Sequence, residues 1–165
     1  MHRLITFAAA LLLSPALLAQ HYEHGDIHVM DPWSRALPPV ASNGAAYLQL
    51  NNRGGVPDRL VGASSPAAER VEIHTHTMDG GMMKMRRVES VDLPPGEYVT
   101  FEPGALHLML FGLKQPFVEG ETYPVTLQFD HAEPVEVTVT VRPVDAGTSS
   151  GHAHGTHGSH ENKKQ

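Results

Sequence analysis

Apolar residues occur in short runs between residues 27 and 144, and glycine, proline or asparagine separates one run from the next. This pattern is typical of β-strands joined by turns. The run from Val135 to Val141 is the clearest, because its valines alternate with polar residues and therefore fall on one face of a strand. We expect strands at Ile27–Val29, Ala45–Asn51, Arg59–Ser64, Arg70–Thr75, Met83–Glu89, Tyr98–Phe101, Leu106–Phe111, Tyr123–Phe129 and Val135–Val141.

The body of the chain has no convincing amphipathic helix of ten or more residues. Short strands at this spacing predict an all-β domain, either a β-sandwich or a small barrel, and the period alone does not separate the two. We expect this single domain to cover residues 20–145.

The first 19 residues have the pattern of a secretory signal peptide. A basic start at Met1–Arg3 precedes an unbroken apolar run from Leu4 to Leu13, and Ser14-Pro15 and a small-residue stretch ending at Ala19 follow. A membrane anchor is the alternative, but the apolar run is shorter than the ~20 residues that a spanning helix needs. We therefore expect cleavage after Ala19, export to the periplasm and no membrane insertion afterwards.

From Ala146 the composition changes to glycine, serine, threonine and histidine, and the sequence ends in lysine and glutamine. Such a segment has little to bury, so residues 146–165 are expected to form a disordered tail. Four histidines lie in it: His152, His154, His157 and His160. They are candidate ligands for Cu(II), with zinc binding or no metal role as the alternatives.

Composition limits the chemistry of the body. The sequence has no cysteine but contains 12 histidines and 7 methionines. A disulfide, a thiolate metal site and dithiol redox chemistry are therefore excluded, and a soft metal would have to be bound by imidazole and thioether groups. The formal charge is −6 and no stripe of lysine or arginine is present, which argues against nucleic acid as a partner.

Histidines and methionines gather around one predicted hairpin. Asp79-Gly80-Gly81 is a turn signal between the two strand-like runs 71–78 and 82–85. A hairpin that closes symmetrically over Asp79 and Gly80 would place His74 opposite Met85 and His76 opposite Met83. Opposed side chains begin only ~4.5–5.5 Å apart, so each pair could share one ion, whereas a slip of one residue would separate them.

A second pair follows in the run Leu106-His107-Leu108-Met109-Leu110. Alternate residues of a strand share a face, so His107 and Met109 point together while the three leucines point into the core. Taken singly, a methionine is more often core filler and a histidine a hydrogen-bonded polar residue. Their joint occurrence beside the hairpin favours a metal site.

Two imidazoles and two thioethers form a neutral, soft ligand set. Such a set suits Cu(I) and offers nothing to Mg²⁺ or Ca²⁺. Zinc is less favoured because its sites use cysteine, histidine and carboxylate ligands.

The spacing of His74, Met85, His107 and Met109 resembles the signature of the PCuAC family of periplasmic copper chaperones. The segments 31–36 and 43–47 and the strand 83–86 are also similar to that family, and the resemblance extends from Ile27 to Val141. It implies a cupredoxin-like Greek-key β-sandwich that binds Cu(I) through these four residues. It also implies delivery of copper to the binuclear copper centre of a respiratory (cytochrome c) oxidase. Family members often carry a methionine close after the first ligand, where this chain has His76 and Met78; with Met83, these are possible auxiliary ligands.

Four functions were weighed against these features. A blue-copper electron carrier is excluded because its site needs a cysteine. A copper enzyme is disfavoured because two thioethers bias the ion toward Cu(I). A copper carrier and a copper buffer without a dedicated acceptor both fit, and the carrier is preferred. The expected partner is a copper-accepting protein such as an oxidase copper-centre subunit, and the chain is expected to be a monomer and not an enzyme.

Overall fold

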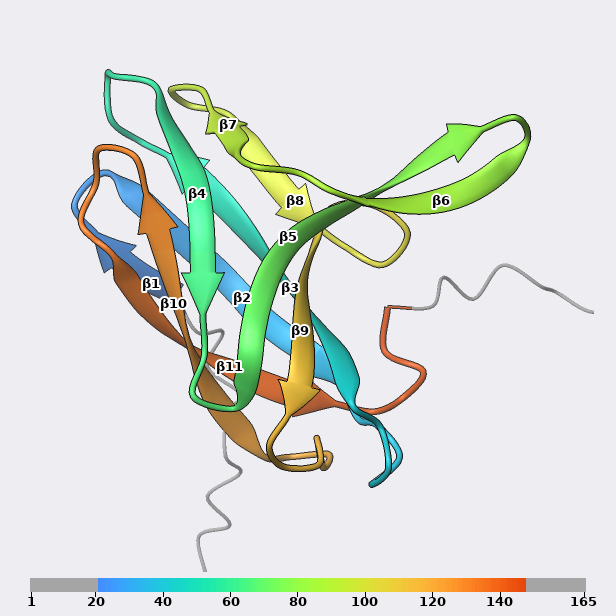
Figure 1. The fold of residues 1–165 in the computed structure, drawn as a ribbon. Coiled ribbons are helices and arrows are strands. Elements are labelled where there is room, and N and C mark those ends of the chain that lie inside the picture. The colour runs from blue at the N-terminus through green and yellow to red at the C-terminus, as the bar shows by residue number, and fades with distance from the viewer. Residues whose placement is uncertain (1–20, 148–165) are drawn as a thin grey trace, which may run out of the picture.

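The computed structural model describes residues 21–147, which form strands and turns and contain no helix. The eleven strands are β1 (His21–His24), β2 (Ile27–Arg35), β3 (Asn43–Asn52), β4 (Asp58–Ser64), β5 (Ala68–Asp79), β6 (Met82–Arg87), β7 (Val91–Leu93), β8 (Tyr98–Phe101), β9 (His107–Leu113), β10 (Thr122–Phe129) and β11 (Val135–Arg142) (Figure 1). This range therefore has no helix with the length and apolar character needed to span a bilayer.

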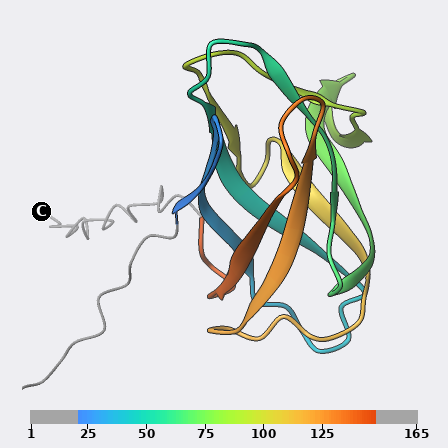
Figure 2. The ribbon, with the colours of Figure 1, turned by 90° about the vertical axis from the view of Figure 1, so that its left-hand side faces the viewer.

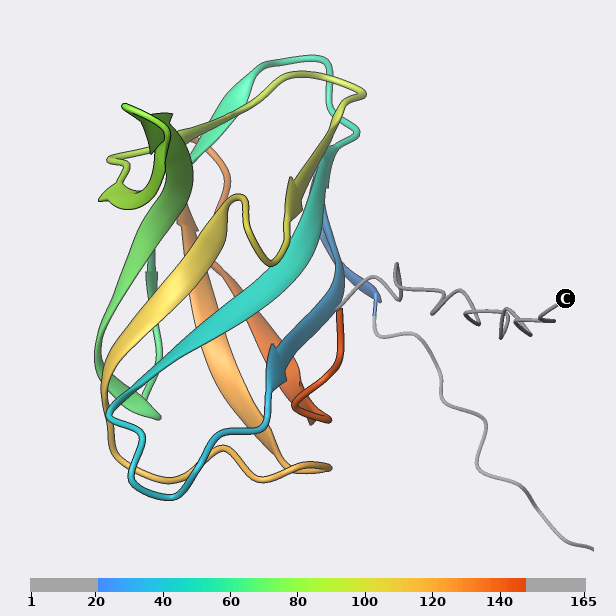
Figure 3. The ribbon, with the colours of Figure 1, turned by 90° about the vertical axis from the view of Figure 1, so that its right-hand side faces the viewer.

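All the strands belong to one hydrogen-bonded sheet that folds over on itself. Their order is β6-β5-β9-β3-β2-β11-β10-β4-β7, with β1 paired to β2 and β8 paired to β3. The strands lie in two layers. In Figure 3 the layer of β5, β9, β3 and β2 faces the viewer and β10 and β11 lie behind it, and Figure 2 shows the same layers from the other side. The crossovers in this order, and the absence of any helix between residues 21 and 147, confirm the predicted single-domain, cupredoxin-like β-sandwich.

The core lies between the two layers and follows from strand alternation. Leu108 and Leu110 of β9 and the odd-numbered valines of β11 are fully or almost fully buried, as predicted. Phe117, in the connection before β10, stacks on Tyr123 with ring centroids 4.3 Å apart. Residues at the alternate positions of β5, β9 and β3 point to the outer face of the front layer, where the candidate ligands lie.

Three strand predictions need correction. No strand was predicted before Ile27, but His21–His24 forms β1 and pairs with the start of β2. The short strand β7 was not predicted, because three residues are too few to show a period. Strand β2 was expected to stop at Val29, yet it continues to Arg35 through a register shift at which Asp31 has a positive φ of 52°.

The hairpin of β5 and β6 projects from the body. Residues 68–74 of β5 pair with β9, and the remainder of β5 pairs only with β6. All six residues of β6 are exposed, and Figure 1 shows the ribbon reaching beyond the other strands. Its turn is made by Gly80 and Gly81, whose φ values of 60° and 79° suit the two-glycine turn that matches the twist of a hairpin.

Candidate metal site

The predicted ligands come from three neighbouring strands of the front layer. His74 of β5 lies directly opposite His107 of β9, and their ring centroids are 5.9 Å apart. His76 lies opposite Met85 of β6. Met109 is two residues along β9 from His107 and opposite Glu72. The structure therefore brings the residues of both sequence motifs to one face.

The hairpin register differs from the predicted one by two residues. His74 faces Arg87 instead of Met85, and Met83 faces Met78 instead of His76. The cause is the turn, since the two positive-φ positions are Gly80 and Gly81 and Asp79 remains in the strand. A shift of two residues keeps every side chain on its predicted face, so the donors stay together while their pairing changes.

The imidazole of His74 is held by a carboxylate. Its Nε2 lies 2.9 Å from Oε2 of Glu72, two residues earlier on the same face. If Nε2 carries the proton and donates it to Glu72, the lone pair is on Nδ1. That Nδ1 is buried and has no hydrogen-bond partner. A ring nitrogen left open while the other is fixed by a carboxylate is the arrangement that metal-binding histidines use.

His107 is fixed in the complementary way. Its Nδ1 lies 3.0 Å from the carbonyl oxygen of Ala105 and donates to it, and its Nε2 is buried without a partner. The residue is only 3% exposed, so it is more enclosed than a residue on the polar face of a strand was expected to be. This burial lowers the pKa of the imidazole, an effect partly opposed by the Ala105 bond. The neutral form, which binds metal, is thereby favoured.

His76 supplies a third imidazole. Its ring stacks on that of His107, with centroids 5.2 Å apart and planes inclined by 29°. Its Nδ1 is also buried and unpartnered. Three open imidazole nitrogens at one place are an unusual concentration of unsatisfied buried groups, which normally find a partner in the protein or in a bound species.

The thioether side chains of β9 and of the hairpin differ in how exposed they are. Met109 is partly buried beside the body, Met85 is 47% exposed, and Met83 and Met78 are 62% and 69% exposed. Met83 and Met78 form a cross-strand pair nearer the turn than Met85. The thioether face therefore runs from the enclosed imidazoles out to the exposed end of the ribbon.

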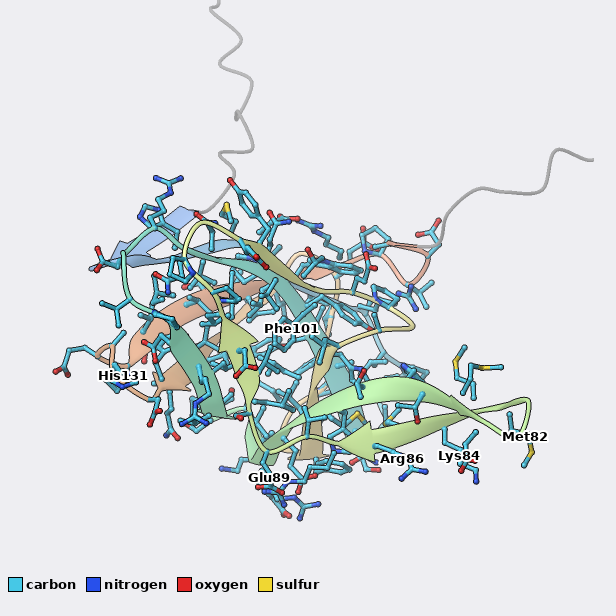
Figure 4. The ribbon with its side chains drawn as sticks, turned by 90° about the horizontal axis from the view of Figure 1, so that it is seen from above. Met82, Lys84, Arg86, Glu89, Phe101 and His131 are labelled. Carbon is cyan, nitrogen blue, oxygen red and sulfur yellow. The ribbon has the colours of Figure 1, made fainter. Side chains whose placement is uncertain are left out.

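Charged groups surround the site without entering it. Glu72 pairs with Arg70 at 2.8 Å and lies 3.7 Å from Arg87. The hydrogen bond from His74, together with these arginines, lowers the pKa of Glu72 against the opposing effect of burial. On the other face of the hairpin Lys84 and Arg86 both pair with Asp79, and Figure 4 shows these two basic residues along β6 with Met82 at the tip.

Within residues 21–147 no group of three or more histidine and carboxylate side chains is placed to hold a metal ion by itself. The further donors on this face are the thioether sulfurs of Met85 and Met109, on strands β6 and β9. This donor set fits a soft, monovalent ion and does not fit a hard divalent one. The tail histidines His152, His154, His157 and His160 lie outside the described residues.

Sequence reasoning missed the groups that orient the imidazoles. Glu72 could have been found, since it precedes His74 by two residues and shares its face of the strand. The Ala105 carbonyl could not, because its role depends on the fold of the 102–106 turn. Phe111, whose ring centroid lies 5.8 Å from that of His74, closes the site on the side of β9.

The fold and this face define a PCuAC-type domain. The structure aligns with the copper-bound PCuAC domain from PmoF2 at a TM-score of 0.65 and 27% identity, over 75% of this chain and 98% of that domain. It also aligns with the solution structure of CuI-DR1885 from Deinococcus radiodurans at a TM-score of 0.57 and 33% identity, over 75% of this chain and 81% of the other.

The sequence belongs to the family described as "Putative lipoprotein LpqE-like", which it matches over residues 27–141. It is 33% identical to "Putative lipoprotein Lxx21020" of Leifsonia xyli subsp. xyli over 112 residues, which are 66% of this chain and 68% of the relative. It is 34% identical to "Uncharacterized protein RP573" of Rickettsia prowazekii over 108 residues, which are 63% of this chain and 60% of that protein.

Proposed function

We propose that this protein is a periplasmic copper chaperone that binds one Cu(I) ion through His74, Met85, His107 and Met109. The observation that carries the proposal is the set of open, buried imidazole nitrogens facing thioethers on a projecting hairpin. The PmoF2 domain, which is copper-bound, and CuI-DR1885 share this fold, and they support the choice of metal.

The observed hairpin register strengthens the case for His76, which the sequence already offered as a possible auxiliary ligand. His76, and not His74, lies opposite Met85, and its ring stacks on the ring of His107. We propose His76 as an auxiliary ligand that alternates with His74, and Met78 and Met83 as weaker ligands nearer the turn. Successive thioethers along an exposed ribbon would let an ion move by exchanging one ligand at a time.

The same features favour transfer over catalysis. Two thioethers stabilise Cu(I) and oppose the cycling between oxidation states that a copper oxidase needs. We therefore propose that the protein is not an enzyme and that it passes its ion to the binuclear copper centre of a respiratory oxidase. The exposed end of the hairpin is the part of the site that an acceptor could reach.

We further propose that residues 1–19 are a signal peptide, that the mature protein works as a monomer in the periplasm, and that residues 20–145 form its copper-binding domain. The family is described as lipoprotein-like, which agrees with a location in the cell envelope. We also propose that the protein does not insert into the membrane after the signal peptide is cleaved.

A Cu(I) titration followed by X-ray absorption tests the site directly. The expected result is one tightly bound ion with both sulfur and nitrogen neighbours in a variant whose four tail histidines are replaced by alanine. A spectrum with only nitrogen and oxygen neighbours would contradict the proposal. His76→Asn should lower the affinity for Cu(I) less than His107→Asn does.

Transfer is tested by mixing the loaded protein with the copper-free soluble domain of an oxidase copper-centre subunit. A carrier should load the acceptor faster than the same concentration of Cu(I) bound to a small-molecule chelator loads it. If the ion stays bound although the acceptor has the higher affinity, the protein is a copper buffer.

A further inference from the structure

The outer part of the β5–β6 hairpin carries a charge opposite to that of the rest of the molecule. This part is residues 75–87, the segment beyond the pairing of β5 with β9, and it contains three basic residues and one acidic residue. The rest of the described range, residues 21–74 and 88–147, contains six basic and sixteen acidic residues. A positive hairpin therefore projects from a strongly negative body.

The basic side chains of the outer hairpin are exposed and only partly neutralised. Lys84 and Arg86 both pair with Oδ2 of Asp79, at 2.8 Å and 3.2 Å, and their side chains are 48% and 60% exposed. One carboxylate cannot balance two cations, so a positive charge remains in excess on this face. Arg87, on the other face, lies 3.7 Å from Glu72 and is 57% exposed.

The opposite end of the molecule is acidic. Figure 4 shows Lys84 and Arg86 on the hairpin at one end and His131 at the other. Two adjoining hollows flank His131, and five carboxylates and one arginine are among the residues that line them: Asp26, Asp58, Asp92, Asp130, Glu133 and Arg59. The charges are therefore separated along the length of the molecule, and Met85 of the proposed ligand set lies at the positive end.

The open edge of β6 gives a partner access to both faces of the hairpin. Within residues 21–147, β6 is the last strand of the sheet and pairs only with β5. Strand alternation puts Lys84 and Arg86 on one face of β6 and Met83 and Met85 on the other. A protein that approaches this edge can contact the basic side chains while its own metal ligands reach the thioethers.

A charge separation of this kind selects the orientation of an encounter. An acidic partner is repelled by the body and attracted by the hairpin, so it is guided to the end that carries Met85. A basic partner would be guided to the opposite end, away from the proposed ligands. The screening length is ~10 Å in 0.1 M salt, so the attraction acts before the two surfaces touch.

We propose that the outer hairpin is the docking surface for an acidic protein partner, and that Lys84 and Arg86 guide the copper acceptor to it. The inference deepens the proposed function and rests on it, since the partner is the protein that takes the copper ion. It adds that the acceptor carries carboxylates around its copper ligands. An anionic membrane would also attract the hairpin, but it would repel the acidic body and offer Cu(I) no soft ligand.

Docking is tested first without copper. The probes are two synthetic peptides that share a core of two serines, which is flanked by glutamates in one peptide and by lysines in the other. In NMR spectra of the isotope-labelled, copper-free protein, the acidic peptide should shift the amide signals of residues 79–87 more than those of any other segment. The basic peptide should leave these signals unchanged, because like charges repel.

Transfer is then measured with peptides in which cysteines replace the two serines. The protein has no cysteine, so the ultraviolet absorption of the Cu(I)–thiolate bond reports only the loading of the peptide. At low salt, the Cu(I)-loaded protein should load the acidic peptide about tenfold faster than the basic peptide. The difference should shrink as the salt concentration is raised.

Replacing both basic residues, Lys84→Gln with Arg86→Gln, should remove most of this preference. The affinity for Cu(I), measured by chelator competition, should stay within about twofold of the wild-type value, because both side chains lie on the face away from the ligands. The matched control is Arg53→Gln with Lys114→Gln. It removes the same charge from two exposed positions outside the hairpin and should keep the preference.

Signal shifts that spread over the body, or a preference that survives in the Lys84→Gln/Arg86→Gln variant, would overturn the inference. Equal loading of the two peptides, together with binding of phosphatidylglycerol vesicles through residues 79–87, would overturn it in favour of a membrane surface. Cu(I) binding without hairpin shifts would overturn the docking surface and leave the copper site intact. Hairpin shifts in a protein that binds no Cu(I) would support the docking surface and contradict the proposed copper site.

Discussion

At the scale of single residues, the site depends on how each imidazole is oriented. Glu72 holds His74 by Nε2 and the Ala105 carbonyl holds His107 by Nδ1, so opposite ring nitrogens are left open in the two residues. Each orienting group is local in sequence. The site is therefore largely preorganised before a metal binds, and the thioethers are the part that remains to be positioned.

Met109→Leu should weaken Cu(I) binding by at least about tenfold while the fold is kept. Leucine has nearly the volume of methionine, so the change should lower the free energy of unfolding by less than ~1.5 kcal/mol. Chelator competition and denaturant unfolding measure the two quantities. Met30→Leu is the matched control, because Met30 is also partly buried but lies on β2, away from the ligands. Equal affinity in both variants would show that Met109 is not a ligand.

Much of the candidate site could be predicted from the sequence, because strand alternation puts His74 with His76 and Met83 with Met85, and a turn of even length then brings the two pairs to one face. Their pairing could not, since it depends on which residues form the turn. Asp79-Gly80-Gly81 allows two readings, and the second glycine decides between them by adopting positive φ. The burial of His107 was also beyond the sequence, because the 102–106 turn that covers it has no periodic pattern.

At the scale of elements, the outer half of the hairpin receives little support from the body of the domain. Strand β6 is exposed throughout and pairs only with β5. Its amide hydrogens should therefore exchange quickly in the copper-free protein. An ion bound by Met85 and by the imidazoles of the body would fasten the ribbon to β9.

Cu(I) should therefore slow amide exchange in residues 82–87 by about tenfold or more, as measured by hydrogen–deuterium exchange with mass spectrometry. Strands β10 and β11 in the same sample serve as an internal reference, since they lie far from the site. Met85→Leu should abolish most of the protection. Protection that persists in this variant would mean that the hairpin is not held through Met85.

The turn between β10 and β11 is attached to β4 by one carboxylate. This turn lies at the opposite end of the molecule from the hairpin, where Figure 4 labels His131. Asp58 of β4 is almost completely buried and accepts hydrogen bonds from the backbone N–H groups of Arg59, His131 and Ala132. Burial raises the pKa of this carboxyl, but the three backbone bonds and the His131 ring outweigh it, so the pKa falls below 3.8. The ionised form thus ties the β10–β11 turn to β4.

Asp58→Asn should lower the free energy of unfolding by about 1–3 kcal/mol at neutral pH, because the amide cannot replace both acceptor oxygens. A carboxyl with a lowered pKa in the folded state stabilises the protein above its unfolded-state pKa, and this contribution is lost as the pH falls through the folded-state value. The difference between wild type and variant should therefore be full above about pH 5 and shrink below pH 4. Urea unfolding across this range measures it, and a difference that does not depend on pH would exclude a role for the charge.

At the scale of the whole molecule, the all-β class followed from alternation and turns. The choice of a sandwich over a barrel followed only from the family resemblance, and the edges of the sheet were not predicted. Strand β1 carries the polar sequence His21–His24 and exists because β2 offers it a partner. Strand β7 has three residues and is placed by its pairing with β4. Both strands are set by tertiary contacts, which a local pattern does not contain.

The tail should give the full chain a capacity for Cu(II) that the body lacks. Replacing His152, His154, His157 and His160 by alanine should remove at least one equivalent of bound Cu(II) at neutral pH, as counted by equilibrium dialysis. The physical reason is that imidazole nitrogens are the only strong Cu(II) donors in that segment. An unchanged capacity would leave the tail without a metal role and weaken the case for copper storage.

The projecting hairpin has a consequence for solubility. Strand β6 ends the sheet, and an unpaired strand edge is a template on which another chain can add by backbone hydrogen bonding. Its exposed methionines would favour apolar contact along that edge, but the strand also carries three positive charges within four residues, on Lys84, Arg86 and Arg87. Two identical edges would bring these charges together and repel each other. The basic residues of β6 thus oppose fibre-like self-association, which allows the methionines of this strand to remain exposed.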